Sequence, residues 1–217
     1  MDCACRDLCP VGRLPLPERE GFVPLMREFA FRKGQVLAAQ GEMSPSLRIL
    51  KTGTLLLQRR SREGRQRVVG LTGRGQTLGT FALLAQANPL SYVSSTAGRC
   101  CELDFAVARG QGVLSGRFMS GLALAHMHEF GKLTDWAHAM RMGGARDQLF
   151  AVLQLLCLEQ GSSCVRLPSQ TVLAELLGTT RETVARSLRV LEAQQQLVRR
   201  DRWHCELLQP VQRPPGG

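Results

Sequence analysis

The sequence contains no apolar run long enough to span a bilayer, and its N-terminus lacks the apolar segment of a secretory signal. We therefore expect a cytoplasmic protein with no membrane partner. The sequence also has no Walker-type phosphate loop and no Gly-x-Ser-x-Gly nucleophile elbow. No motif places a cysteine beside a histidine as a nucleophile pair. An enzyme is therefore not the expected class.

Acidic residues are outnumbered, because 18 Asp and Glu stand against 28 Lys and Arg, which gives a formal charge of +10 over 217 residues. This balance suggests a polyanionic partner, nucleic acid first and an anionic membrane second. Seven basic residues fall between Lys51 and Arg74, where Glu63 is the only acid. That stretch is not the helix that we expect to read DNA, so a solvated hairpin face is the favoured interpretation there.

Cysteine is abundant, with eight residues in the chain. Disulfides are rare in the cytoplasm, so these thiols are expected to pack, bind metal or respond to redox state. Cys3, Cys5 and Cys9 lie within the first nine residues. Cys157, Cys164 and Cys205 lie in or next to apolar segments and are predicted to belong to the core.

Composition and periodicity divide the chain into five segments, which together predict an α+β fold. Short apolar runs separated by glycines indicate a small β-roll, with a hairpin tip at Glu63-Gly64. A short helix is predicted around Glu18 to Phe29. The segments are a cysteine-rich lead-in (1–20), the β-roll (21–110), a long helix with a hinge (111–143), a helix-turn-helix domain with a final hairpin (144–210) and a disordered tail (211–217).

The long helix is amphipathic and contains no proline from Gly112 to Met142. It would be about 45 Å long, and one small domain cannot cover both of its sides. A partner helix is therefore expected, although packing within one chain is the alternative. The favoured interpretation is a homodimer. The predicted interface consists of Leu122, Ala125, Phe130, Leu133, Trp136 and Met140.

The most informative stretch runs from Ser169 to Arg200. Ser169 is a suitable N-cap, apolar residues then recur at helical spacing, and Gly178 ends the helix. Thr179 or Thr180 then caps a second helix. Two short helices joined by a glycine-containing turn are typical of a helix-turn-helix.

The second helix separates its charged and apolar side chains. At about 3.6 residues per turn, Val184, Leu188 and Leu191 share one arc of the helix. The opposite arc carries Arg181, Glu182, Arg186 and Arg189.

Those charged side chains suit base recognition in the major groove. Arginine donates two hydrogen bonds to guanine, and glutamate accepts one from cytosine. Arg181, Glu182 and Arg186 are therefore the candidate base-reading residues. Alternatively, Thr179 and Glu182 form a capping box, and the arginines are simply solvated. The candidate phosphate contacts are Ser169, Gln170, Thr171, Thr180 and Arg189.

The stretch from Arg181 to Glu192, RETVARSLRVLE, resembles the cyclic-AMP-receptor type of recognition helix in the CRP/FNR family. Two further segments resemble the family's β-roll: FRKGQVLAAQGE (31–42) and LKTGTLLL (50–57). The long helix and Gly143-Gly144 are similar to its dimer helix and hinge, and DRWHCELL (201–208) to its wing.

The resemblance implies an N-terminal cyclic-nucleotide-binding-like β-roll, a long dimerisation helix and a C-terminal winged helix-turn-helix. It also implies a transcription activator that acts as a homodimer with RNA polymerase. Arg181, Glu182 and Arg186 occupy the family's base-reading positions, which implies a near-palindromic site with TGTGA-like half-sites.

The resemblance is incomplete where the family binds cyclic AMP. In GTFALLAQANPLS (79–91), Thr80 replaces the glutamate that holds the ribose, and Leu90 replaces the arginine that pairs with the phosphate before Ser91. A buried phosphate without a cation is costly. Cyclic AMP is therefore not expected to bind.

The FNR branch suggests a different sensor. Cys101 matches the position of that branch's β-roll ligand, and Cys9 lies at a matching distance ahead of Lys33-Gly34. Cys3 and Cys5 would supply the other two thiolates, which implies a [4Fe–4S] cluster. The spacing differs, because this chain has C-x-C-x3-C where that branch has C-x2-C-x5-C. Zinc, a thiol redox switch and unligated thiols are the alternatives.

Two further interpretations stay open. His126 and His128 on the long helix could hold haem, although a solvated or interface role is favoured. The chain could also be an effector-independent regulator, or a redox or metal-binding protein that does not bind DNA.

Overall fold

The computed structural model describes residue 3 and residues 5–209. The predicted disordered tail, 211–217, lies outside these residues. The lead-in contains a 3₁₀ turn at Arg6–Leu8, helix α1 at Leu16–Phe22 and a second turn at Val23–Leu25. The prediction of one helix from Glu18 to Phe29 is therefore wrong in its second half. Pro24 interrupts the helix, and strand β1 begins at Met26, where it pairs with β8.

Eight strands form the β-roll, as two four-stranded antiparallel sheets with the orders β1-β8-β3-β6 and β2-β7-β4-β5. Alternate side chains point inward, so Phe31, Leu50, Leu57 and Cys100 share a buried cluster. The strands are β1 (Met26–Phe31), β2 (Val36–Ala38), β3 (Ser46–Thr52), β4 (Leu55–Arg60), β5 (Gln66–Thr72), β6 (Thr77–Leu78), β7 (Ser91–Ser94) and β8 (Gly98–Asp104).

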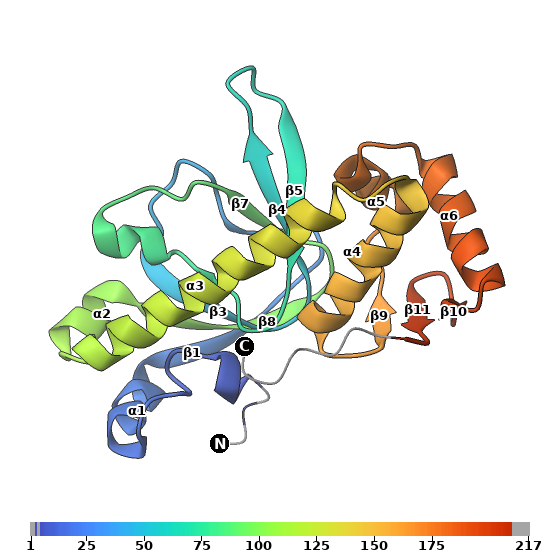
Figure 1. The fold of residues 1–217 in the computed structure, drawn as a ribbon. Helices are drawn as coiled ribbons and strands as arrows, with labels where there is room; N and C mark the ends of the chain where they lie inside the picture. Colours follow the sequence, from blue (N-terminus) through green and yellow to red (C-terminus); the bar gives the residue numbers. More distant parts are fainter. Residues whose placement is uncertain (1–2, 4, 210–217) are drawn as a thin grey trace.

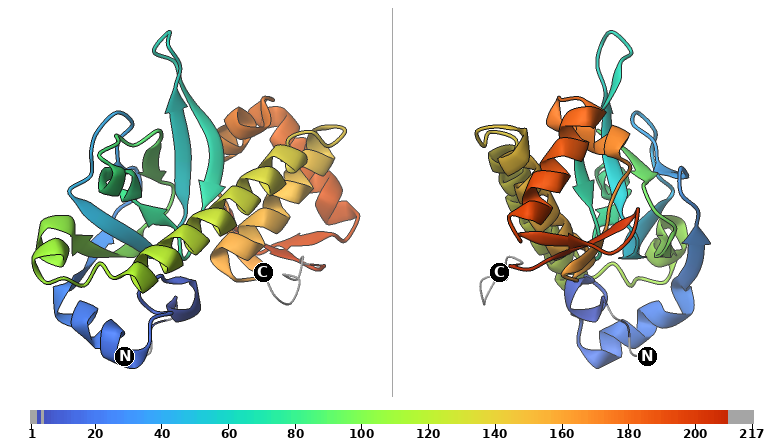
Figure 2. Two further views of the ribbon diagram at one scale, coloured as in Figure 1. Left: turned by 60° about the vertical axis from the view of Figure 1, so that its left-hand side comes forward. Right: turned by 90° about the vertical axis from the view of Figure 1, so that its right-hand side faces the viewer.

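The β4–β5 hairpin projects beyond the rest of the molecule (Figures 1 and 2). Its tip lies at Glu63-Gly64, as the turn residues predicted. Arg59 of β4 pairs with Arg67 of β5 below the tip. The basic side chains near the tip are solvent-exposed, in agreement with the interpretation as a solvated face. They are Arg59, Arg60, Arg62, Arg65 and Arg67.

The long helix is α3, Gly116–Ala139, which follows the short helix α2, Phe105–Gly110. Its 24 residues give a length of about 36 Å, shorter than the sequence predicted. Ser115 begins α3 by accepting a hydrogen bond from the Phe118 N–H. Figure 1 shows α3 crossing the β-roll. Neither α3 nor any other helix within the described residues has the length and apolarity to cross a membrane.

The C-terminal unit follows Gly143-Gly144 and consists of three helices and a small sheet of order β10-β11-β9. Its core continues into the β-roll, because Leu56, Val68 and Leu71 belong to the same buried cluster as Leu153 and Leu188. The elements are α4 (Ala145–Gln160), β9 (Cys164–Arg166), α5 (Gln170–Leu177), α6 (Arg181–Ala193), β10 (Leu197–Arg199) and β11 (His204–Leu207).

Candidate DNA-binding site

Local hydrogen bonds define both helices of the helix-turn-helix. The Ser169 hydroxyl accepts a hydrogen bond from the Val172 N–H at 3.3 Å and begins α5. Gly178 ends α5 with φ of +60°, a conformation that glycine adopts without strain. The Thr180 hydroxyl then accepts from the Thr183 N–H at 3.2 Å and begins α6. Thr180 is therefore the cap, and the Thr179–Glu182 capping box is not the motif that starts α6.

The apolar side of α6 is buried as its spacing predicted. Val184, Leu188 and Leu191 belong to the cluster that also contains Leu153 of α4 and Leu173 of α5. Burying one such side chain contributes about 1.5–3 kcal/mol. This packing fixes which side of α6 faces solvent.

The opposite side of α6 is exposed at Arg181, Glu182, Arg186 and Arg189. In the right-hand view of Figure 2, α6 lies at the front of the molecule. The pKa of Glu182 is lowered, first because the carboxylate accepts a hydrogen bond from its own backbone N–H, and also because the Thr180 hydroxyl donates to it. Glu182 is therefore an ionised acceptor at neutral pH.

The predicted phosphate-contacting residues lie at the start of α5, at the N-cap of α6 and on α6 itself. Thr171, Thr180 and Arg189 are exposed, whereas Ser169 and Gln170 are half-buried at the start of α5. The Arg189 Nε also lies 3.4 Å from the Ala185 carbonyl oxygen, which it reaches along the helix.

The hairpin β10–β11 is the predicted wing, and Asp201 organises its turn. Its carboxylate accepts hydrogen bonds from the backbone N–H groups of Trp203 and His204. Two cations lie close to the Trp203 ring, with Lys33 Nζ at 5.2 Å and the Arg202 guanidinium at 4.9 Å from its centroid. Lys33 follows β1, so the wing contacts the β-roll. This contact could not be predicted from the sequence, because no local pattern joins residues so far apart.

The β-roll and the C-terminal unit each match the model of a known protein family. Residues 28–109 match the family model of the cyclic nucleotide-binding domain, and residues 148–211 match that of the Crp-like helix-turn-helix domain. Such a pairing defines a transcription regulator with an N-terminal sensor domain and a C-terminal DNA-binding domain. The chain belongs to the CRP/FNR family, whose members are DNA-binding proteins and not enzymes.

Solved structures share this fold at low sequence identity. FixK2 from Bradyrhizobium japonicum is 18% identical with a TM-score of 0.70, over 85% of this chain and 93% of that chain. The c-di-GMP responsive global regulator CLP of Xanthomonas campestris is 18% identical with a TM-score of 0.65, over 89% and 99%. A CRP-family transcriptional regulator from Thermus thermophilus is 16% identical with a TM-score of 0.65, over 83% and 92%. Comparison with curated proteins gave no match.

The residues that replace the family's nucleotide contacts are engaged within the β-roll. Thr80 is buried, and Leu90 packs against the roll's apolar cluster. The Ser91 hydroxyl accepts a hydrogen bond from the Gln40 N–H at 2.9 Å. That cyclic AMP does not bind this chain stays a prediction.

The four candidate ligand cysteines gather where the lead-in meets the β-roll. Burial is the main reason that the pKa values of Cys5, Cys9 and Cys101 are raised, and the pKa of Cys101 reaches about 11. The nearby Cys3 raises all three pKa values further. The Cys5 thiol donates to the Lys51 carbonyl oxygen at 3.0 Å.

This gathering is not a formed metal centre. Within the described part of the chain, no three Cys, His, Asp or Glu side chains converge where a metal ion could bind. As arranged, the thiols do not fit a resident metal or cluster.

The three cysteines of the C-terminal unit differ in burial. Cys157 and Cys205 are buried, as predicted for core residues. Cys164 is exposed, and the prediction is wrong for it, because Val165 takes the inward position of β9. Of the two histidines of α3 that were considered as haem ligands, His126 Nδ1 lies 3.0 Å from the Glu129 carboxylate, and His128 is exposed.

The predicted dimer residues lie on two sides of α3. Leu122, Ala125 and Trp136 are buried by their own chain, so they offer no surface to a partner. Met140 is half-buried just after α3. Phe130 and Leu133 are 68% and 48% exposed. Three more apolar residues of α3 are exposed: Met119 and Met127 lie on the same side as Phe130, and Leu124 lies farther around the helix.

Proposed function

We propose that this chain is a sequence-specific regulator that reads a near-palindromic, TGTGA-like site with Arg181, Glu182 and Arg186. The observation that carries the proposal is the exposure of these three side chains on the first turns of α6, while Val184 and Leu188 hold the other side in the core. Recognition helices contact bases with their N-terminal residues.

The exposed side chains match the chemistry of such a half-site. Arg181 and Arg186 present guanidinium groups that can each donate two hydrogen bonds to a guanine, and Glu182 stays ionised to accept from cytosine. Ser169, Gln170, Thr171, Thr180 and Arg189 are proposed to fix the register through phosphate contacts.

A palindromic site requires two copies of α6, and we propose that the copies are joined through the outer side of α3. Met127 is 72% exposed and Phe130 is 68% exposed on a helix whose other side is covered by its own chain. Exposed apolar side chains gathered on one helix face are typical of an interface. RNA polymerase as a partner, activation and a cytoplasmic location also stay proposals.

The test compares DNA duplexes that differ only in the half-sites. Binding of full-length protein is measured by fluorescence anisotropy for a TGTGA palindrome and for a scrambled duplex of equal length. We expect the Arg181→Ala/Arg186→Ala variant to lose most of the preference, since each bidentate contact contributes about 1–3 kcal/mol of discrimination. Arg62→Ala/Arg65→Ala, which removes equal charge from the exposed hairpin, is the matched control. Equal preference in the α6 variant and the wild type would refute the proposal that Arg181 and Arg186 recognise the bases.

A specific observation favours control by oxygen or redox state, namely the gathering of Cys3, Cys5, Cys9 and Cys101 from two distant parts of the sequence. The [4Fe–4S] cluster implied by the resemblance is untested, and binding it would require the thiols to rearrange. Anaerobically purified protein is assayed for iron, sulfide, zinc and visible absorbance, and its DNA affinity is compared with that of air-exposed protein. Cys101→Ser should abolish the difference in affinity, whereas Cys164→Ser should retain it. Equal affinities in both preparations, with neither metal nor sulfide bound, would exclude regulation of DNA binding by oxygen or redox state.

A further inference from the structure

The loop between β5 and β6, residues 73–76, contacts the DNA-binding unit through Glu159. The Gly73 N–H donates to the Glu159 carboxylate at 2.6 Å, and the Arg74 N–H donates to the Glu159 carbonyl oxygen at 3.1 Å. Glu159 lies in the last turn of α4, the first helix of the DNA-binding unit. One residue thus bonds to the loop through both its side chain and its backbone.

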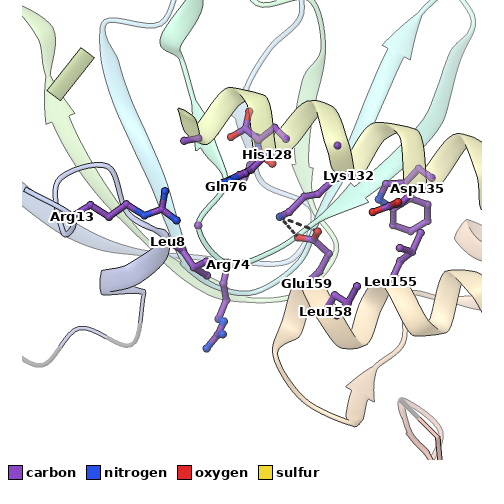
Figure 3. Close-up of a pocket in the computed structure, with 15 residues that line it drawn as sticks. Leu8, Arg13, Arg74, Gln76, His128, Lys132, Asp135, Leu155, Leu158 and Glu159 are labelled. Atoms are coloured by element: carbon purple, nitrogen blue, oxygen red, sulfur yellow. Dashed lines mark hydrogen bonds and ion pairs between the residues drawn. The ribbon is translucent and has the colours of Figure 1, made fainter. Parts of the chain in front are cut away.

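The same carboxylate also reaches α3. Lys132 Nζ lies 2.9 Å and 3.0 Å from the two carboxylate oxygens of Glu159, as Figure 3 shows. The Glu159 side chain is only 4% exposed. A buried carboxylate is costly unless it is paired and hydrogen-bonded, so these partners hold it strongly in one position. Glu159 therefore joins three parts of the chain at one buried point.

The backbone at this contact leaves no room for a side chain. A Cβ atom placed on Gly73 would lie 2.3 Å from the Glu159 carbonyl oxygen. The loop therefore cannot shift relative to α4 here without breaking the hydrogen bonds.

The other side of the same loop contacts the cysteine-bearing lead-in. Gly75 has φ of +84°, and a Cβ atom placed there would lie 2.6 Å from the Leu8 Cβ. The Gly75 N–H donates to the Leu50 carbonyl oxygen, and the Cys5 thiol donates to the carbonyl of the next residue, Lys51. The segment from Cys5 to Leu8 and the loop thus rest on the same end of β3.

A cavity of about 250 Å³ lies beside these contacts. Its lining includes Leu8, Arg74, Lys132 and Glu159 (Figure 3). Among the described residues, the buried Arg74 Nε has no hydrogen-bond partner. Leu8 therefore borders free space, whereas Gly73 is held against Glu159.

We propose that Glu159 is a positioning residue that fixes the DNA-binding unit against the sensor domain, and that residues 73–76 pass displacements of the Cys5–Leu8 segment to α4. This inference rests on the proposed function, because it names how α6 is oriented for DNA. In a dimer the two recognition helices must match half-sites about 34 Å apart, so a small rotation of α4 lowers affinity.

The experiment uses full-length protein and a double-mutant cycle. DNA affinity for the TGTGA palindrome is measured for wild type, Leu8→Ala, Glu159→Gln and the double variant. Hydrogen exchange of the peptide that contains Gly73 and Arg74 is measured on the same four proteins without DNA. Thermal unfolding identifies any variant that fails to fold. Glu63→Gln, an exposed hairpin residue, is the charge-matched control.

We expect Glu159→Gln to weaken palindrome binding by roughly tenfold and to speed exchange of the loop, because allosteric couplings commonly correspond to about 5- to 150-fold. Leu8→Ala should alter affinity and loop exchange in the wild-type background and alter neither in the Glu159→Gln background. Glu63→Gln should match the wild type. Additive effects of Leu8→Ala and Glu159→Gln, or a Glu159→Gln protein with wild-type affinity and exchange, would overturn the proposal.

Two further outcomes keep this inference separate from the proposed function. If the wild type shows no preference for the palindrome, the proposed function fails. The positioning role is then judged from loop exchange alone, and unchanged exchange in Glu159→Gln rejects it. If Glu159→Gln does not fold, Lys132→Met replaces it, since this variant removes the α3 partner and keeps the hydrogen bond to Gly73. Lys132→Met should then also speed loop exchange, and unchanged exchange overturns the proposal.

Discussion

The carboxylate of Glu175 on α5 accepts a hydrogen bond from the backbone N–H of Val68 on β5, at 2.9 Å. Val68 is buried in the cluster that also holds Leu153 and Leu188. The helix-turn-helix is therefore attached to the base of the β4–β5 hairpin by a polar bond and by a shared apolar core.

This bond gives a first prediction. Glu175→Ala removes the acceptor of the Val68 N–H, so exchange of that amide should accelerate while amides in the centre of α3 stay protected. Hydrogen exchange followed by mass spectrometry of the β5 peptide measures this. Glu206→Ala, which removes a carboxylate from the wing, is the control and should leave the β5 peptide unchanged. Unaltered exchange in Glu175→Ala would show that the bond does not protect Val68.

The N-cap of α6 gives a second prediction. Thr180→Ala removes the hydroxyl that accepts from the Thr183 N–H, and loss of such a cap costs about 1 kcal/mol of stability. Urea unfolding should show this decrease for Thr180→Ala and much less for Thr180→Ser, which keeps the hydroxyl. Similar losses in both variants would mean that the methyl group matters and the cap does not.

The outer side of α3 gives a third prediction. Phe130→Glu places a charge in the proposed dimer interface, where it would be desolvated without a partner. Sedimentation velocity should show a dimer for the wild type and a monomer for Phe130→Glu, and palindrome binding should weaken with dimerisation. His128→Glu, also exposed on α3, should remain dimeric. A dimeric Phe130→Glu protein would place the interface elsewhere.

His126 gives a prediction about pH. The Glu129 carboxylate beside it raises the pKa of His126 above 6.5, although partial burial opposes this shift. The pair therefore stabilises the fold fully below about pH 6.5, and its contribution is lost as pH rises through the raised pKa. The side chain is 39% exposed, so solvent screening limits the effect to at most about 1 kcal/mol. His126→Gln should remove this part of the pH dependence of urea unfolding, and His128→Gln should keep it.

The parts of the fold that were predicted correctly depend on local signals. The spacing of Val184, Leu188 and Leu191 determined the buried side of α6, and Gly178 marked the end of α5. The hairpin tip at Glu63-Gly64 followed from turn chemistry. The candidate base-reading residues could be selected for the same reason, since the exposed side of α6 is what its packing leaves free.

The features that were missed depend on pairing between distant segments. Phe29 is in β1, where it pairs with Cys100 of β8, although its neighbours in sequence favoured a helix. Helical spacing also could not show which apolar residues of α3 the β-roll covers, so Trp136 was predicted at an interface and is buried in its own chain. Glu159 carried no local signal, because its role depends on Gly73 and Lys132.

The β4–β5 hairpin has a consequence for the kinetics of association. Its five exposed arginines form a cationic arm that extends away from the rest of the chain (Figure 2). Long-range attraction between such an arm and a polyanion is independent of base sequence and falls steeply as ionic strength rises. We expect the arm to make early encounters with DNA frequent and short-lived, so that salt changes how often the protein meets DNA more than how well it tells one half-site from another.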